Sequence, residues 1–287
     1  MKLYTGQNFP DERDLYGADG VKLIGCTFDG AADGESALKE ARNVILENCY
    51  MNLRYPLWHN NAVEIKGVEM TENCRAALWY SSEVKISESK LNGIKALREC
   101  EDVTIDKSRI CSPEFGWKSS VIRITDTEIL SQYAFLLARD IKLDKVKFTG
   151  KYAFQYVRSA VIENSVLDTK DAFWHAQNVT VKNCTVKGEY LGWYSENMTF
   201  INCEIIGTQP LCYCKNLKLV NCTMRDTDLS FEYSDVDAHI YGSILSVKNP
   251  RSGKINADGI GEVILTEDSK YPCNCKITIG AQHSKGA

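Results

Sequence analysis

The sequence repeats one short phrase almost from end to end, with apolar residues at its first and third positions and a small residue at its sixth. Copies begin at Val21, Val44, Val63, Val84, Val103, Ile122, Ile141, Ala160, Val179, Met198 and Leu217. From Val84 to Leu217 the starting residues lie 133 positions apart, which is seven intervals of 19 without a slip. A repeat of this length predicts a solenoid in which each copy packs against the next.

Within each copy the residue types alternate, as in the stretch VTID from Val103. This alternation has the period of a β-strand with one buried face, whereas a helix would show a period of 3.6. The chain between two copies is too short for a helical crossover. It also lacks the hexapeptide submotif of left-handed solenoids. We therefore predict an all-β fold, a single-stranded right-handed parallel β-helix with about 19 residues per coil and capped ends.

The repeat also predicts the domain organisation, a single β-helix domain over residues 1–287. Residues 1–40 would form the N-terminal cap and first coil, residues 41–235 the regular coils, and residues 236–287 the C-terminal coils and cap. Caps are expected because a bare terminal coil would pair with another chain. We assign the stretch GESALKE from Gly34 to the first cap, and the segment from Val247 onward to turns and short strands of the second.

Stacking in register converts positions 19 residues apart into columns. The small sixth position should point inward and includes Cys184, Cys203 and Cys222. In-register side chains point in parallel, so we favour free core thiols over disulfides. The fifth position of the repeat is predicted to be a tight corner, because it holds residues that tolerate the left-handed conformation: Gly25, Asn48, Gly67, Asn164, Asn183, Asn202 and Asn221.

The chain has twelve cysteines, and two C-x-C pairs, Cys212/Cys214 and Cys273/Cys275, are the nearest approach to a metal motif. Zinc usually requires four ligands, and no His lies near either pair. The sequence also lacks a phosphate loop, a dinucleotide fingerprint and an HExxH motif. We therefore expect no metal site and no cofactor.

Charge and hydropathy exclude several classes of partner. The 34 basic and 38 acidic residues give a formal net charge of −4, and neither sign forms a long block. Such a chain lacks the basic footprint that binds nucleic acid or a membrane surface, so we expect neither as a partner. The opening residues lack the apolar core of a signal peptide, and no apolar run approaches the roughly 18 residues of a membrane span. A cytoplasmic protein is expected.

A second recurring segment between the strands is rich in aromatic residues. Two of its adjacent positions form columns, the first including Trp58, Trp79, Trp117, Trp174 and Trp193, and the second including His59, Tyr80, Tyr156, His175, Tyr194, Tyr213 and Glu232. Adjacent residues of a strand face opposite ways, so one column should be buried and the other exposed. The Tyr and His column is the more polar and is expected to be exposed.

A ridge of aromatic rings beside polar side chains is typical of surfaces that stack on sugar rings and bind their hydroxyls. On this hypothesis the protein binds or processes carbohydrate, and the binding residues are Trp58, Tyr156, Trp174, Trp193, Tyr194 and Glu232. Two other interpretations stay open. The rings could simply hold coil on coil, or they could form the protein-contact face of a non-catalytic scaffold. The candidate partners are thus an oligosaccharide or, in a homodimer, a second copy of the chain.

Whether the protein is an enzyme is left open. An activity like that of a polysaccharide lyase or glycoside hydrolase would have four candidate catalytic residues, which are Asp171, His175, Asp226 and Asp228. Glycoside hydrolysis needs two carboxyls about 5–9.5 Å apart. Asp171 and Asp228 share a column at roughly 14 Å, whereas Asp226 and Asp228 would lie about 6.6 Å apart in an extended strand. We favour the alternative that these acids serve turns and that His175 is an ordinary surface side chain.

Longer motifs show a resemblance to a known family: GESALKE, YPLWHNN, DAFWHAQNVTVKNC, GEYLGWYSENMTFINC, PLCYCKNLKLVNC, LSFEYSDVDA and VKNPRSGKINADGIGE. From roughly Tyr4 to Leu265 the chain resembles the bacterial domain-of-unknown-function family 3737, which in turn resembles the pectate-lyase-like right-handed β-helix superfamily. The resemblance implies the same fold and no established activity. The acidic constellations of that superfamily's lyases and hydrolases are not matched, so no catalytic residue is carried over.

Overall fold

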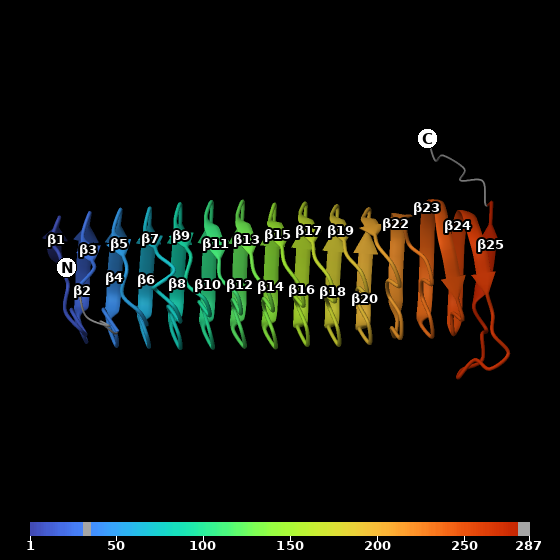
Figure 1. Ribbon diagram of the computed structural model, residues 1–287, viewed down its shortest axis with the longest axis horizontal. Helices are drawn as coiled ribbons and strands as arrows, with labels where there is room; N and C mark the ends of the chain where they lie inside the picture. The colour runs from blue at the N-terminus through green and yellow to red at the C-terminus, as the bar shows by residue number, and fades with distance from the viewer. Residues whose placement is uncertain (31–35, 281–287) are drawn as a thin grey trace. The chain divides into compact units, whose positions relative to one another are not determined.

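The computed structural model of the protein describes residues 1–30 and 36–280. The chain divides into two compact units, Met1–Gly150 and Lys151–Ala287, and each is a parallel β-helix in which strands of successive coils lie side by side (Figure 1). None of the residues in the described ranges forms a helix that could cross a membrane. The predicted fold class, an all-β parallel β-helix with about 19 residues per coil, is confirmed. The single domain over residues 1–287 stays a prediction.

In Met1–Gly150 the typical coil contains a strand of six residues followed by one of two or three. The strands are β1 (Lys2–Thr5), β2 (Asp19–Ile24), β3 (Thr27–Phe28), β4 (Arg42–Glu47), β5 (Tyr50–Met51), β6 (Asn61–Lys66), β7 (Glu69–Met70), β8 (Ser82–Ser87), β9 (Lys90–Leu91), β10 (Glu101–Asp106), β11 (Arg109–Cys111), β12 (Ser120–Thr125), β13 (Glu128–Leu130), β14 (Arg139–Asp144) and β15 (Lys147–Thr149). The long strands pair in register at the repeat length, with Val103 of β10 opposite Ile122 of β12.

Lys151–Ala287 begins with the same pattern. Its strands are β16 (Arg158–Glu163), β17 (Val166–Asp168), β18 (Gln177–Lys182), β19 (Thr185–Lys187), β20 (Glu196–Ile201), β21 (Glu204–Ile206), β22 (Leu217–Arg225), β23 (Asp235–Lys248), β24 (Ser252–Ile264) and β25 (Lys276–Ile279). Val179 of β18 lies opposite Met198 of β20, again one repeat apart.

The core lies inside the coil and is made by alternate residues of the long strands. In β18, Val179 and Val181 are buried while their neighbours are partly exposed. Complete burial of such a side chain stabilises the fold by about 1.5–3 kcal/mol. The alternation seen in the sequence therefore has the predicted physical basis.

The predicted corners are confirmed. Asn164, Asn183, Asn202 and Asn221 have φ angles between 50° and 54°, in the left-handed region that Asn tolerates. Their amides also bond from coil to coil, since Asn183 Nδ2 donates to Asn164 Oδ1 over 3.2 Å and Asn202 Nδ2 donates to Asn183 Oδ1 over 3.2 Å. The corner residue thus sets the bend and stabilises the stack.

The core position of the cysteine column is also confirmed, because Cys184, Cys203 and Cys222 are buried free thiols. Elsewhere, burial raises the pKa of the Cys100 thiol to about 12 and that of the Cys214 thiol to about 11. Cys100 and Cys214 are therefore protonated at neutral pH and serve as small apolar side chains.

The prediction for the last coils is wrong in part. From Val247 the sequence predicts turns and short strands, but the chain forms β23 of 14 residues and β24 of 13 residues. The two strands pair from Asp235 opposite Ser252, and their register shifts between Ile240 and Ser243. Gly242 lies at this irregularity with φ +78° and lets one continuous strand bend where an asparagine corner separates two strands in earlier coils.

At the N-terminal end, β1 pairs with β2 and forms the first coil. The predicted cap motif GESALKE begins at Gly34, and its first two residues lie outside the described residues.

Candidate functional site

The aromatic segment between strands is a turn rather than a strand. In Lys151–Ala287, Tyr152, Phe154 and Tyr156 all have φ between 56° and 59°, so the alternation of an extended strand does not apply. Phe154 is fully buried, the next residue Gln155 is half-buried, and Tyr156 is 46% exposed. The prediction that one aromatic column is buried is therefore wrong. The prediction that the Tyr and His column is exposed is confirmed for Tyr156, His175 and Tyr194, whereas Tyr213 and Glu232 are partly buried.

The Trp column of Lys151–Ala287 lies flat on the turns and joins neighbouring coils. Trp174 and Trp193 stack with ring centroids 5.5 Å apart and an interplanar angle of 7°. Each indole N–H donates to a carbonyl of the next coil, from Trp174 to Tyr190 over 2.7 Å and from Trp193 to Gln209 over 2.9 Å. These two predicted binding residues thus use their only polar atom within the fold.

Met1–Gly150 contains a comparable column. Trp58 stacks on Trp79 at 5.1 Å and donates its indole N–H to the carbonyl of Ala76 over 2.6 Å. The guanidinium of Arg98 then lies between two indoles, 4.5 Å from the Trp79 ring and 4.7 Å from the Trp117 ring. Trp58, predicted as a binding residue, therefore has a clear role in stacking coils.

The Tyr and His column of Lys151–Ala287 forms a continuous stack of rings, the outer ladder, which we define as the exposed Tyr156, His175 and Tyr194 and the partly buried Tyr213. Successive centroids are 4.8, 5.1 and 4.7 Å apart, and the interplanar angles are 9°, 8° and 13°. Because the ring faces cover one another, the ladder presents ring edges to solvent. Within the described part of the chain, the hydroxyls of Tyr156 and Tyr194 and the ring nitrogens of His175 make no hydrogen bond.

Polar columns follow the outer ladder along each coil. Arg158, Gln177, Glu196 and Lys215 come two residues after the four rings and are partly or fully exposed. An asparagine column comes next, in which Asn197 Nδ2 donates to Asn178 Oδ1 over 3.0 Å and Asn216 Nδ2 donates to Asn197 Oδ1 over 2.8 Å. Ring edges, amides and charges are therefore repeated together at the spacing of the coils.

Glu232, a predicted binding residue, is committed to an ion pair. Its carboxylate lies 2.9 Å from Lys248 Nζ, and its side chain is 15% exposed. Burial, reinforced by the negative charge of Glu232, raises the pKa of Tyr213 to about 12. Tyr213 was not among the predicted binding residues, although its position 19 residues after Tyr194 was the signal that could have placed it there.

Asp171 is the most unusual of the predicted catalytic residues, because it is buried and 7% exposed. Desolvation raises the pKa of its carboxyl, and Glu189 adds to this effect, while Lys170 and Lys151 oppose it. Lys170 Nζ is itself held 2.7 Å from Glu189. A carboxyl whose proton is bound more tightly than usual is suited to hydrogen bonding with a ligand or to proton transfer.

Of the other predicted catalytic residues, His175 shares the turn of Asp171, whereas Asp226 and Asp228 belong to a later coil. Asp226 has φ 55° in the turn that follows β22 and pairs with Arg225, at 3.5 Å. Asp228 follows in the same turn, so the extended geometry assumed for this pair is not found. His175 lies with its ring faces against Tyr156 and Tyr194. A pair of carboxyls for glycoside hydrolysis is thus not assembled from Asp171 and Asp228, which their column keeps roughly 14 Å apart.

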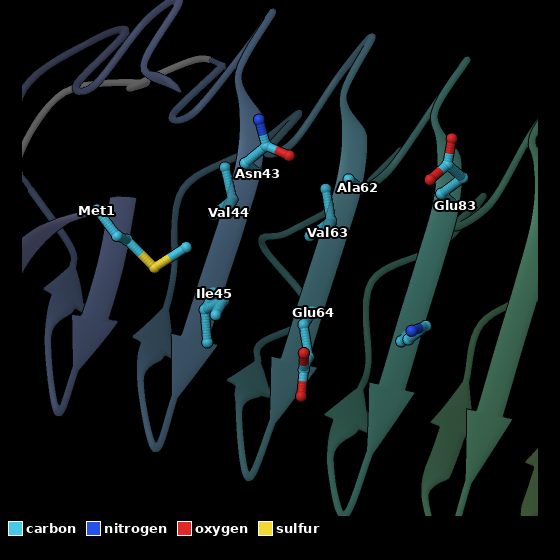
Figure 2. A pocket seen from close by; sticks show the side chains of 9 residues that line it. Met1, Asn43, Val44, Ile45, Ala62, Val63, Glu64 and Glu83 are labelled. Carbon is cyan, nitrogen blue, oxygen red and sulfur yellow. The ribbon is translucent and has the colours of Figure 1, made fainter. Parts of the chain in front are cut away.

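Two hollows lie away from the predicted site residues. The first, of about 220 Å³, is on the surface of β4, β6 and β8, where Met1 lies beside Val44 and Ile45, and Ala62 and Glu64 line the hollow on the next strand (Figure 2). The second, of about 360 Å³, is lined by the chain from Leu265 to Cys273. Across residues 1–30 and 36–280, no group of three or more His, Cys, Asp or Glu side chains is arranged to hold a metal ion.

Comparison with known proteins identifies a family and distant structural neighbours. The family described as "Protein of unknown function (DUF3737)" matches residues 2–278. No curated protein matches the chain.

Three similar solved structures are proteins that act on polysaccharides. A mutant of the periplasmic alginate epimerase AlgG is 10% identical, with 91% of this chain and 72% of that chain covered, and a TM-score of 0.31. The Azotobacter vinelandii mannuronan C-5 epimerase AlgE4 A-module is 11% identical, with 96% and 89% covered, and a TM-score of 0.29. The catalytic domain of a GH87 alpha-1,3-glucanase mutant, in complex with tetrasaccharides, is 9% identical, with 97% and 63% covered, and a TM-score of 0.23.

Proposed function

Because the chain belongs to the family of proteins of unknown function DUF3737, its function has to be inferred from its own site, and we propose that it binds a linear carbohydrate along the outer ladder. The observation that carries this proposal is the repetition of exposed ring edges and free polar atoms in successive coils at Tyr156, His175 and Tyr194, with the partly buried Tyr213 continuing the stack. The edges offer apolar contact, and the phenol and imidazole groups offer hydrogen bonds to hydroxyls.

The spacing of the ladder favours a ligand that is itself a repeating chain. Coils follow one another at about 4.8 Å, so a polymer lying parallel to the coil axis would meet the same kind of side chain at each step. Weak contacts then add up, because each further contact is intramolecular once the first has formed. The polar columns of Gln177 and the asparagines would bind the hydroxyls on one side of such a chain.

We expect saturable binding of a linear hexasaccharide, measured by isothermal titration calorimetry against cellohexaose, mannohexaose, maltohexaose and hexagalacturonate. Replacing Tyr194 by alanine removes the ring between His175 and Tyr213 and should weaken binding of the tightest panel member about tenfold or more. Tyr241→Ala is the matched control, because Tyr241 is 40% exposed on β23, outside the outer ladder, and its removal should leave the affinity unchanged.

Two results would contradict the proposal. The first is the absence of heat and of saturation with every panel member. The second is an outer ladder that joins copies of the chain, which light scattering of concentrated protein would show as a dimer that Tyr194→Ala converts to a monomer.

A further inference from the structure

The Trp column of Lys151–Ala287 is interrupted at Gln155. Gln155 Nε2 donates to the carbonyl of Asp171 over 3.2 Å, which is the bond that Trp174 makes to Tyr190 one coil later. The turn at Asp171 is therefore covered by an amide where the next two turns are covered by indoles. Asp171 therefore lies in the turn that Gln155 covers, where no indole lies.

The carboxyl of Asp171 lacks a partner in the fold. The residue is 7% exposed, and among the described residues no side chain or backbone N–H donates to its carboxylate. Within residues 1–30 and 36–280, the polar side-chain atoms that are fully enclosed without a partner are Asn60 Nδ2, Arg98 Nε, Thr169 Oγ1, Thr227 Oγ1 and Ser230 Oγ. The oxygens of Asp171 are not among these atoms, so the carboxyl still reaches the surface.

Among the described residues, no cation pairs directly with Asp171. Lys170 and Lys151 act on its carboxyl only through their fields, and Lys170 is bound to Glu189 at 2.7 Å. Removing a carboxylate from water without giving it donors is unfavourable, so such a group holds its proton more tightly or takes donors from water, an ion or a ligand. Two neighbouring hydroxyls of a sugar ring supply donors in the arrangement that a carboxylate accepts.

We propose that Asp171 anchors the carbohydrate, with two adjacent hydroxyls of one sugar unit donating to its carboxylate beside Gln155 and Trp174. This inference rests on the proposed function and deepens it, because it places a polar anchor in the same turns that carry the outer ladder. Tyr156 of the ladder directly follows Gln155, and His175 directly follows Trp174.

The anchor makes binding sensitive to pH. Hydroxyl donors favour the ionised carboxylate, so binding lowers the pKa of Asp171. Binding therefore releases protons at pH values where the Asp171 carboxyl of the free protein is still protonated. We expect the affinity to fall as the pH is lowered through the raised pKa of Asp171. Lys170, Glu189, Lys151 and Tyr190 are the other titratable groups near the anchor, and their variants serve as controls.

The test compares wild type with Asp171→Asn by calorimetry with the tightest hexasaccharide of the panel, in buffers of different ionisation enthalpy between pH 4 and pH 8. Asp171→Asn should bind about tenfold more weakly or worse and should release no protons. Glu189→Gln removes a neighbouring carboxyl that is exposed and bound to Lys170, and this variant should keep the proton release. Gln155→Trp completes the Trp column over Asp171 and should also abolish binding while the protein stays folded.

Stability provides a second readout. The folded state holds the proton of Asp171 more tightly than the unfolded chain, whose ordinary pKa is 3.8, so wild type loses stability as the pH rises from 3.8 through the raised pKa. Above that range Asp171→Asn should be at least as stable as wild type. Its loss of affinity would then come from the site and not from unfolding.

The outcomes separate the two proposals. If Tyr194→Ala loses binding but Asp171→Asn keeps the affinity and proton release of wild type, the anchor is wrong and the proposed function stands. If no panel member binds wild type, both are wrong. If Asp171→Asn is less stable than wild type at pH 8, the carboxyl is a structural group and the anchor is overturned.

Discussion

Gly188→Ala is expected to destabilise Lys151–Ala287 by about 4 kcal/mol or more. A Cβ atom at this position would lie 1.8 Å from the carbonyl oxygen of Thr169 and 2.6 Å from its carbon, and this backbone belongs to the neighbouring coil. Gly188 also has φ +153°, which side chains rarely adopt. Since the obstacle is backbone, relief requires the two coils to separate. Urea unfolding followed by circular dichroism measures the loss.

Gly242→Ala is the control for this substitution. Gly242 also has a positive φ, at +78°, but nothing lies within 4 Å of its added Cβ. Only the conformational strain remains, at about 1–2 kcal/mol. Equal losses for the two variants would mean that close coil packing at Gly188 is not a source of stability.

Phe173→Ala is expected to lower the free energy of unfolding by about 3–5 kcal/mol. Phe173 is fully buried and stacks on Phe154 with centroids 4.9 Å apart and an interplanar angle of 9°. Its removal leaves a cavity inside the coil, where the rigid neighbouring coils limit collapse. The midpoint of urea unfolding should fall, with the slope unchanged.

Tyr194→Ala is the matched comparison, because it removes a stacked ring from the outside of the same unit. Tyr194 is 46% exposed, so its contribution is limited to stacking contacts, about 1–2 kcal/mol. If Tyr194→Ala destabilised the protein as much as Phe173→Ala, the outer ladder would be mainly a structural element and the case for a ligand there would weaken.

The sequence predicts the fold well because a solenoid repeats one set of local rules. Val103 and Ile122 are paired in space because they occupy the same position in successive repeats. Each asparagine corner adopts the same left-handed backbone conformation. The position of the cysteine column follows from the same register. Short-range patterns are sufficient where every coil packs on a copy of itself.

The aromatic turns could not be predicted in the same way. Strand alternation assigns Trp174 and His175 to opposite faces, but the left-handed residues Phe173 and His175 turn the backbone so that both side chains lie outside. The surroundings of Asp171 depend on Gln155, which contacts its turn from the preceding coil. No pattern within one coil shows this contact. The long strands β23 and β24 depend on a bend at Gly242 that departs from the repeat.

The central claim is that a linear carbohydrate runs along the outer ladder, and the dependence of affinity on ligand length tests it most directly. The ladder has rungs at Tyr156, His175, Tyr194 and Tyr213. Calorimetry with a di-, tri-, tetra- and hexasaccharide of one series should show affinity that rises with each added unit up to about four units and then levels off. A disaccharide that binds as tightly as the hexasaccharide would contradict the claim, because the ligand would then occupy one local site.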